Sequence, residues 1–242
     1  MLTRFELHYN IQKGNFFTNK IVFDTHTIYY SENMSAYYFN YAVVSDLRSV
    51  SSLMEEIRAD FAKINRKPCI YINANQLSEL RDLQKHNMQV RFSESCLRFD
   101  GEEIKTLHQI VPVDEKNIHD FIEVYKKQEN IHTFRLEADY QNGLFKALKN
   151  PDFYNIVAYD GKRPVAIASM GQYNGFYMIY SLATDKEYFG KGYSQTVLGA
   201  CTNKFKELNG KALYVMQQAN TGLEKLYIQN GFKKIFTGHI LY

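Results

Sequence analysis

Between Phe153 and Thr184, strand-like runs alternate with two turn signals, and this order leaves few folds open to the chain. The runs 153–159 and 165–170 are rich in β-branched and apolar residues, and the Asp160-Gly161 pair between them is a strong hairpin signal. A second turn, Asn174-Gly175, leads into the run 176–184, the longest strand candidate of the sequence. Three antiparallel strands are therefore expected in this part of the chain.

A glycine loop, Gly190-Lys191-Gly192, follows these strands and precedes a helical pattern that Asn209-Gly210 is expected to end. A strand over 212–216, a short helix over 221–229 and a last strand over 232–242 come next. Cys201 belongs to the apolar stripe of the first helix and is interpreted as a core residue rather than a nucleophile. The other members of that stripe are Val197, Leu198, Phe205 and Leu208.

The first hundred residues approximately repeat the pattern of the last ninety. Tyr41–Asp46 resembles Tyr180–Asp185, and Lys67–Asn75 resembles Lys211–Asn220. Between these matched segments, a helical pattern runs through Leu53, Met54, Ile57, Phe61 and Ile64, whereas the stretch 47–52, equivalent to the glycine loop, contains no glycine. Leu80, Leu83 and Asn87 recur at Leu223, Leu226 and Asn230, each 143 positions later. An internal duplication explains this pattern.

Between the two copies, 114–128 predicts an amphipathic helix with Asp114 as its N-cap. The pattern thus indicates an α/β (α+β) chain with two similar halves.

Composition excludes several classes of protein. The formal net charge is +3, too small to imply a nucleic-acid or membrane partner. Three cysteines without a close pair argue against a disulfide framework, and the seven histidines show no zinc-binding spacing, so no metal is expected. The N-terminal segment lacks the continuous apolar core of a signal peptide, and no apolar run is long enough to span a membrane. A cytoplasmic, soluble protein is expected.

The glycine loop suits an anion, because glycines before a helix turn several backbone N–H groups toward one point. An ordinary tight turn is the alternative at this stage. Gln195 stands where a dinucleotide-binding fingerprint needs a third glycine or alanine, and Gly192 stands where a P-loop needs Ser or Thr. The nucleophile-elbow pattern fails at Thr196, which replaces its second glycine.

The wider pattern resembles the GCN5-related N-acetyltransferase (GNAT) superfamily over residues 106–242. The residues that carry the resemblance are Leu182-Ala183-Thr184, Glu187-x-x-Gly190-x-Gly192, Ala219-Asn220, Leu226-Tyr227 and Asn230-Gly231-Phe232. Glu187 stands where the family usually has Arg or Gln. The resemblance implies two GNAT-like mixed β-sheets with flanking helices: a degenerate GNAT-like domain over 1–104 and an acetyltransferase domain over 105–242 that holds the acetyl-CoA site.

The resemblance also implies the reaction, which is direct attack of a primary amine on the thioester of acetyl-CoA. The acceptor would be a small molecule, an amino acid or a peptide. Tyr227 takes the position of the general acid, with packing beside the sheet as the alternative, and Asn220 either touches the pantetheine arm or ends a strand. The general base is open among Glu129, His132 and Glu137, with a role as surface charges or a water relay as the alternative. The residues expected to bind acetyl-CoA are Leu182, Ala183, Thr184, Gly190, Lys191, Gly192, Tyr193, Ser194 and Asn220.

Two other functions stay open on the same fold. One is a noncatalytic acyl-CoA-binding or regulatory module that kept the loop without turnover. The other is a transferase that uses aminoacyl-tRNA, which the loop disfavours because a pyrophosphate site would be superfluous there. Exposed edge strands make a homodimer a reasonable expectation.

Overall fold

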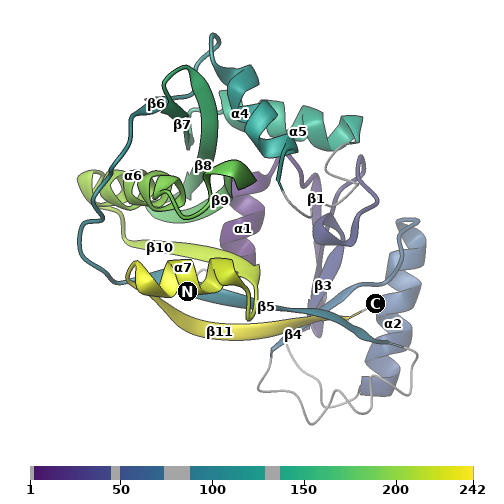
Figure 1. Ribbon diagram of the computed structural model, residues 1–242. Helices are drawn as coiled ribbons and strands as arrows, with labels where there is room; N and C mark the ends of the chain where they lie inside the picture. The colour runs from purple at the N-terminus through teal and green to yellow at the C-terminus, as the bar shows by residue number, and fades with distance from the viewer. Residues whose placement is uncertain (1–2, 45–49, 74–87, 129–136, 242) are drawn as a thin grey trace.

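The computed structural model describes residues 3–44, 50–73, 88–128 and 137–241. Within these residues, eleven strands form one continuous mixed sheet with helices on both faces (Figure 1). The strands of the first half are β1 (Asn19–Val22), β2 (His26–Tyr30), β3 (Tyr41–Val44), β4 (Ile70–Asn73) and β5 (Val90–Phe99). Those of the second half are β6 (Ile110–Pro112), β7 (Phe153–Asp160), β8 (Arg163–Tyr173), β9 (Phe176–Thr184), β10 (Ala212–Gln218) and β11 (Phe232–Leu241).

The strand order is β1-β2-β3-β4-β11-β5-β10-β9-β8-β7-β6, so strands of the two halves interleave at the centre. β5 of the first half lies antiparallel between β10 and β11, and β11 lies antiparallel between β4 and β5. Outward from this central pair, each side continues with a parallel pair, β4 with β3 and β10 with β9, and then with antiparallel strands. The α/β (α+β) class is confirmed.

The sequence predicted two sheets, whereas the structure has one. The reason is the pairing of β5 and β11, each of which closes an edge of the other half. An open edge presents unpaired backbone N–H and C=O groups. In this exchange of strands, β5 pairs with β10 of the second half and β11 pairs with β4 of the first, so the edge groups of both halves are paired. The same strand order on both sides of the central pair is what an internal duplication would produce.

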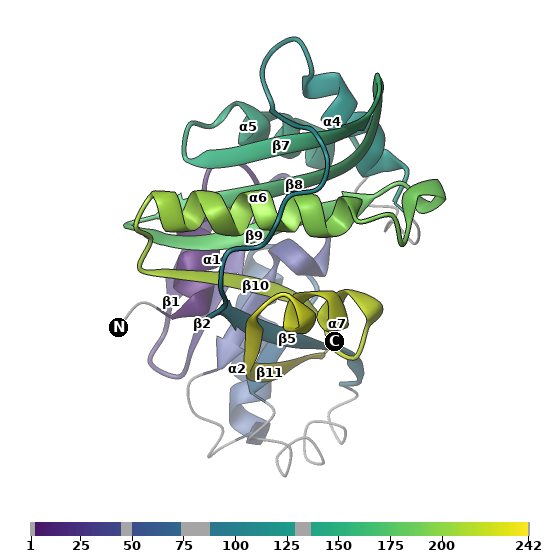
Figure 2. The same cartoon turned by 60° about the vertical axis from the view of Figure 1, so that its left-hand side comes forward.

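Helices cover the two faces of the sheet. On one face, α6 (Tyr193–Glu207) packs on β7, β8 and β9, and α7 (Gly222–Gln229) packs near β10 and β11 (Figure 2). α2 (Val50–Lys63) covers the strands of the first half through Leu53, Ile57 and Phe61. On the other face, α1 (Arg4–Gln12), α4 (Ile118–Lys126) and α5 (Ala138–Lys149) share one hydrophobic cluster.

Most of the local predictions are confirmed. β9 has the predicted bounds, Asn174 and Gly175 have positive φ in the turn before it, and the helical pattern of the first copy forms α2. The helix expected from Asp114 begins later, at Ile118 with Asn117 as N-cap, because the Asp114 carboxylate accepts from the N–H groups of Lys116 and Asn117 in a turn instead. The expected repeat at Leu80, Leu83 and Asn87 lies outside the described residues.

Two further observations concern helices and cysteines. None of the helices in the described ranges combines the length and apolar character that a membrane span requires. Cys201 is fully buried on α6, as predicted, and burial raises the pKa of its thiol to about 12.

Candidate functional site

The parallel strands β9 and β10 separate part of the way along their length. They pair from Phe176 with Ala212 to Ile179 with Val215, and no pairing continues beyond that point. On the other edge of β9, the register with β8 shifts, and Ser181 adopts φ 50°. A positive φ at a residue other than glycine inside a strand is a strained bulge, which is common at functional sites. The splay leaves one backbone edge of β9 open beside this bulge.

The glycine loop lies just beyond the open end of β9, after a short 3₁₀ turn. Gly190 and Gly192 have φ 74° and 85°, and α6 begins at Tyr193 without a side-chain cap. The N–H groups of the first helical turn therefore lack an intrahelical partner, and the positive end of the helix dipole points the same way. A Cβ built on Gly190 would meet no atom within 4 Å, so there is room against the backbone. These features fit a phosphate or pyrophosphate.

Three contacts, one from Thr184 and two from His108, hold the loop in place. The Thr184 hydroxyl lies 2.8 Å from the Ser194 hydroxyl and links the end of β9 to α6. His108 stacks on Tyr193 with ring centroids 3.8 Å apart, and its Nε2 lies 2.8 Å from the Lys191 carbonyl oxygen. A loop fixed in this way presents its N–H groups without having to reorganise.

Glu187 is the residue that departs from the usual GNAT pattern. The Arg163 guanidinium donates to its carboxylate at 2.7 Å and to that of Asp185 at 3.0 Å. The acidic charge at the entrance of the loop is therefore paired with a cation. Lys191, the middle residue of the loop, is exposed, and its ammonium group lies 4.6 Å from the centre of the Tyr188 ring.

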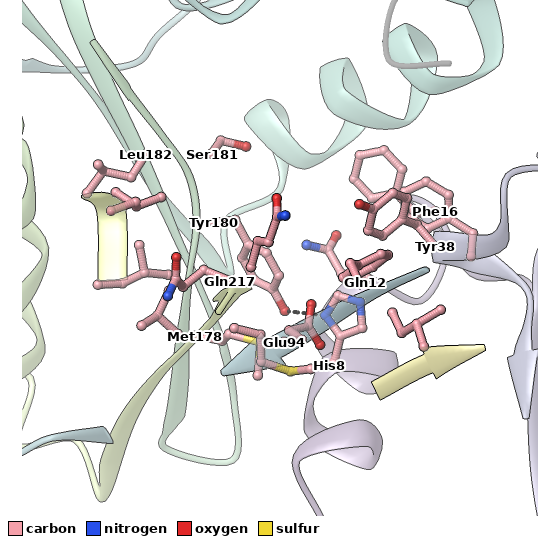
Figure 3. Close-up of a pocket in the computed structure, with 18 of the residues that line it drawn as sticks. His8, Gln12, Phe16, Tyr38, Glu94, Met178, Tyr180, Ser181, Leu182 and Gln217 are labelled. Carbon is pink, nitrogen blue, oxygen red and sulfur yellow. Dashed lines mark hydrogen bonds between the residues drawn. The ribbon is translucent and has the colours of Figure 1, made fainter. Parts of the chain in front are cut away.

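A cavity of about 430 Å³ begins where β9 and β10 separate. Tyr227 of α7 lines it from one face of the sheet and His8 of α1 from the other, so the cavity passes through the gap between the two strands. Figure 3 shows Ser181 and Leu182 at one end, Phe16 and Tyr38 at the other, and Glu94 and Gln217 between them. Both halves of the chain therefore line the cavity.

Glu94 of β5 is a cavity-lining residue that the sequence analysis missed. Burial raises the pKa of its carboxyl to about 7, while the Tyr71 hydroxyl and the Arg4 guanidinium act in the opposite direction. The sequence gives only a weak indication of this role. Phe92, Glu94 and Cys96 are alternate residues of one strand and share one face, and only the packing of the other elements shows that this face lines a cavity. A carboxyl group with such a pKa can exchange a proton near neutral pH.

Several other polar groups face the cavity. The His8 ring nitrogen Nδ1 lies 3.0 Å from the Tyr180 hydroxyl, and burial lowers the pKa of His8 to about 4, so this ring is neutral at pH 7. Gln12 Oε1, Gln128 Nε2 and Gln217 Nε2 are buried atoms without a hydrogen-bond partner among the described residues, and all three residues line the cavity. Buried polar atoms normally have partners, so these atoms are available to a ligand or water.

The structure brings some of the predicted site residues together and separates others. Leu182 and Tyr227 line the cavity, whereas Asn220 does not; it follows β10 at φ 61°, and its N–H donates to the Glu224 carboxylate. The predicted residues from Ala183 to Ser194 follow one another from the end of β9 to the start of α6. Burial raises the pKa of Tyr227, which keeps its phenol protonated.

The three general-base candidates receive little support. Glu129 and His132 lie outside the described residues, and Glu137 is an exposed residue that precedes α5. Within the described part of the chain, His, Cys, Asp and Glu side chains form no group of three that could hold a metal ion.

Comparison with known proteins agrees with this geometry. Residues 115–232 match the model of the acetyltransferase (GNAT) family. This segment is a GNAT domain. It contains the splayed strands, the bulge, the glycine loop and all of α7, whereas β5 and α1, which help to line the cavity, precede it in the chain. No match was found among curated proteins.

Solved structures extend the likeness beyond the GNAT domain. The chain is similar to a functionally unknown conserved protein from Staphylococcus epidermidis, with a TM-score of 0.76 and 16% identity over 92% of this chain and 93% of that one. A GCN5-related N-acetyltransferase from Kribbella flavida gives 0.69 and 14% over 92% and 88%, and one from Sphaerobacter thermophilus gives 0.67 and 13% over 90% and 79%. At these identities the likeness shows a shared fold, and it includes both halves.

Proposed function

We propose that the protein is an acetyl-CoA-dependent N-acetyltransferase that transfers the acetyl group to a primary amine. The observation that supports this most strongly is the continuity between three features: the glycine loop, the open edge of β9 and the cavity through the sheet. An anion-binding cradle at one end and a chamber with titratable groups at the other match a donor with a pyrophosphate and a reactive thioester.

On the donor side, the chain binds mainly through its backbone. The N–H groups of Gly190 and of Gly192–Ser194 hold the pyrophosphate, whereas the N–H of Lys191 donates to the Tyr188 carbonyl oxygen. The exposed Lys191 side chain adds positive charge beside the pyrophosphate. The open edge of β9 over Leu182–Thr184 pairs with the amides of the pantetheine arm. The bulge at Ser181 turns the backbone of β9, so that the N–H group of Leu182 is aimed at the thioester carbonyl and polarises it.

On the acceptor side, Glu94 and Tyr227 divide the proton transfers. The carboxylate of Glu94 takes a proton from the ammonium group, and the neutral amine nitrogen attacks the thioester carbon. The carbon–sulfur bond then breaks, and Tyr227 donates its phenolic proton to the leaving thiolate. The second proton of the nitrogen passes through water to the tyrosinate and restores the phenol. Glu94 releases the first proton to solvent, so one proton is released for each amide formed.

A noncatalytic acyl-CoA-binding module is the alternative. A module of that kind needs the glycine loop, but it does not need two groups with perturbed pKa values in the same cavity. Glu94 and Tyr227 come from different halves of the chain and line one chamber, which favours an enzyme.

The test combines acetyl-CoA binding with turnover. Thermal unfolding is followed with saturating acetyl-CoA, ATP or NAD for the wild type, for Gly192→Asp and for Gly175→Asp. The two glycines have φ 85° and 80°, so the substitutions impose similar backbone strain, but only Gly192 belongs to the loop. A ligand at about 100 times its Kd adds about 2.7 kcal/mol, or roughly 5–11 °C for a chain of this size.

We expect a shift specific to acetyl-CoA that Gly192→Asp abolishes and Gly175→Asp retains. Release of free thiol from acetyl-CoA, measured against a panel of primary amines, then reports turnover. Binding without amine-dependent thiol release would favour the noncatalytic module, and the absence of any acetyl-CoA shift would refute the proposed function.

A further inference from the structure

The end of the cavity farthest from Leu182 is walled by aromatic rings, most of which come from the first half of the chain (Figure 3). Phe16 stacks on Phe39 with centroids 5.2 Å apart, and Tyr38 packs against Phe92 at 5.4 Å. Rings that hold one another in this way form a preorganised apolar surface. They bind a flat or apolar group at a low cost in side-chain entropy.

Glu94 lies between this aromatic wall and the bulge of β9 (Figure 3). None of the cations in the described ranges comes within 4.0 Å of its carboxylate, although the Arg4 guanidinium is close enough to lower its pKa. Arg4 is instead held over the rings of Phe236, at 3.1 Å from the centroid, and Phe5, at 4.3 Å. A partly buried carboxylate beside aromatic faces attracts an organic cation, both through its charge and through the rings.

Unpartnered amide groups give a second, independent indication of a ligand. Gln12 is 4% exposed and Gln217 is 8% exposed, yet Gln12 Oε1 and Gln217 Nε2 have no hydrogen-bond partner in the part of the chain that the structure describes. Gln12 comes from α1 and Gln217 from β10, so the two amides reach the same chamber from opposite sides. An acceptor oxygen and a donor nitrogen left open in one cavity suit the N–H groups of an amine and the carbonyl of the acyl donor, respectively.

From these features we propose that the acceptor is a compact arylalkylamine, whose ring packs on the aromatic wall and whose ammonium group is held by Glu94. The inference rests on the proposed function and adds the class of acceptor. The cavity of about 430 Å³ is the size of a small-molecule site. An α-carboxylate on the acceptor would be brought close to Glu94, so the corresponding amino acids are poor acceptors.

The test measures amine binding directly, by calorimetry on the full chain with and without saturating CoA. The probes are 2-phenylethylamine, phenylalanine and n-propylamine, which differ in the carboxylate and in the ring. Glu94→Gln removes the charge with little change of shape, and Phe92→Leu removes one ring of the wall. The matched controls are Glu103→Gln, at an exposed carboxylate, and Phe145→Leu, at an exposed ring of α5.

We expect 2-phenylethylamine to bind at least about tenfold more tightly than either other probe. Loss of a hydrogen bond to a charged group predicts at least tenfold weaker binding in Glu94→Gln. Loss of an aromatic contact predicts about two- to tenfold weaker binding in Phe92→Leu. The two controls should bind as the wild type does, and thermal melts confirm that each variant is folded.

Three results would overturn the inference: no binding of 2-phenylethylamine with or without CoA, equal binding by Glu94→Gln, or equal affinity for phenylalanine. The two proposals fail separately. Amine binding that depends on Glu94 in a protein that does not bind acetyl-CoA refutes the proposed function alone. Acetyl-CoA-dependent turnover of a peptide or amino acid, with no response to arylalkylamines, refutes the acceptor class alone.

Discussion

Replacement of Glu94 by Gln is expected to stabilise the protein at alkaline pH and to leave its stability unchanged at acid pH. In the folded state the pKa of this carboxyl is about 7, against 4.5 for an ordinary glutamate, because burial disfavours the charged form. A folded-state pKa above the unfolded one means that the native state binds the proton more tightly. The contribution of the protonated Glu94 carboxyl to the free energy of unfolding is therefore fully present below pH 4.5 and is lost as the pH rises through 7.

The size of the effect follows from the difference between the two pKa values. Each pKa unit corresponds to 1.36 kcal/mol, so the ionised carboxylate costs up to about 3 kcal/mol at pH 8. For a chain of this length that corresponds to roughly 6–12 °C in Tm. The groups that face Glu94 do not titrate in this window: Arg4 stays charged, and the pKa values of Tyr41, Tyr71 and Cys96 are raised.

His8 makes the comparison with a variant necessary. Its pKa is lowered to about 4 from 6.5, so its neutral burial makes the protein more stable as the pH rises from 4 to 6.5. This slope opposes that of Glu94 and can flatten the curve of the wild type. Subtraction of the wild-type curve from that of Glu94→Gln removes the contribution of His8.

The assay is urea denaturation of both proteins at half-unit steps from pH 4 to pH 8. We expect the difference in unfolding free energy to grow from near zero to about 3 kcal/mol, with its midpoint between the two pKa values. A difference that stays constant over this range would refute the reasoning, because it would mean that Glu94 has the same pKa in the folded and unfolded states.

Three further predictions concern the donor side and the central strands. Tyr227→Phe should lower kcat at least tenfold and leave the acetyl-CoA affinity unchanged; steady-state kinetics with calorimetry would check this, and an unchanged kcat would exclude the tyrosine as general acid. Ser181→Val should destabilise the protein by about 1–2 kcal/mol in urea, whereas Ser181→Gly should not, because a β-branched residue opposes φ 50° more strongly than serine and glycine accepts it. Residues 106–242 expressed alone should aggregate, since β10 and β11 lose the strand between them; a monomeric, folded fragment by gel filtration and circular dichroism would contradict the exchange of strands.

Local signals determine how much of this fold the sequence predicts. The turns at Asp160-Gly161 and Asn174-Gly175 specify hairpins through residues that accept positive φ, and both glycines adopt it. The glycine loop and the start of α6 are predictable for the same reason. The insertion of β5 between β10 and β11 is different, because it depends on which distant edges are open, and no local pattern encodes that choice.

The same distinction applies to the candidate site. The residues of the donor side follow one another along β9, the loop and α6, so a pattern in the sequence can find them. Glu94 and most of the aromatic wall come from separate elements of the first half. They line one cavity only because α1 and β5 pack against the GNAT domain, which the sequence pattern does not show. Asn220 has a positive φ in the turn after β10 and does not line the cavity, so its predicted contact with the pantetheine arm stays a prediction.

The interleaved centre of the sheet also means that the first half cannot complete its strand pairing until the end of the chain has been synthesised. β5 ends about 130 residues before β11 begins. A ribosome that adds about 5–20 residues per second needs roughly 7–27 s to synthesise the residues between them. Throughout this interval β4 and β5 lack the strand that joins them in the finished protein. The first half of the nascent chain therefore has unpaired strand edges during this interval. We expect the yield of folded protein to depend on how well those edges are protected from aggregation until synthesis ends.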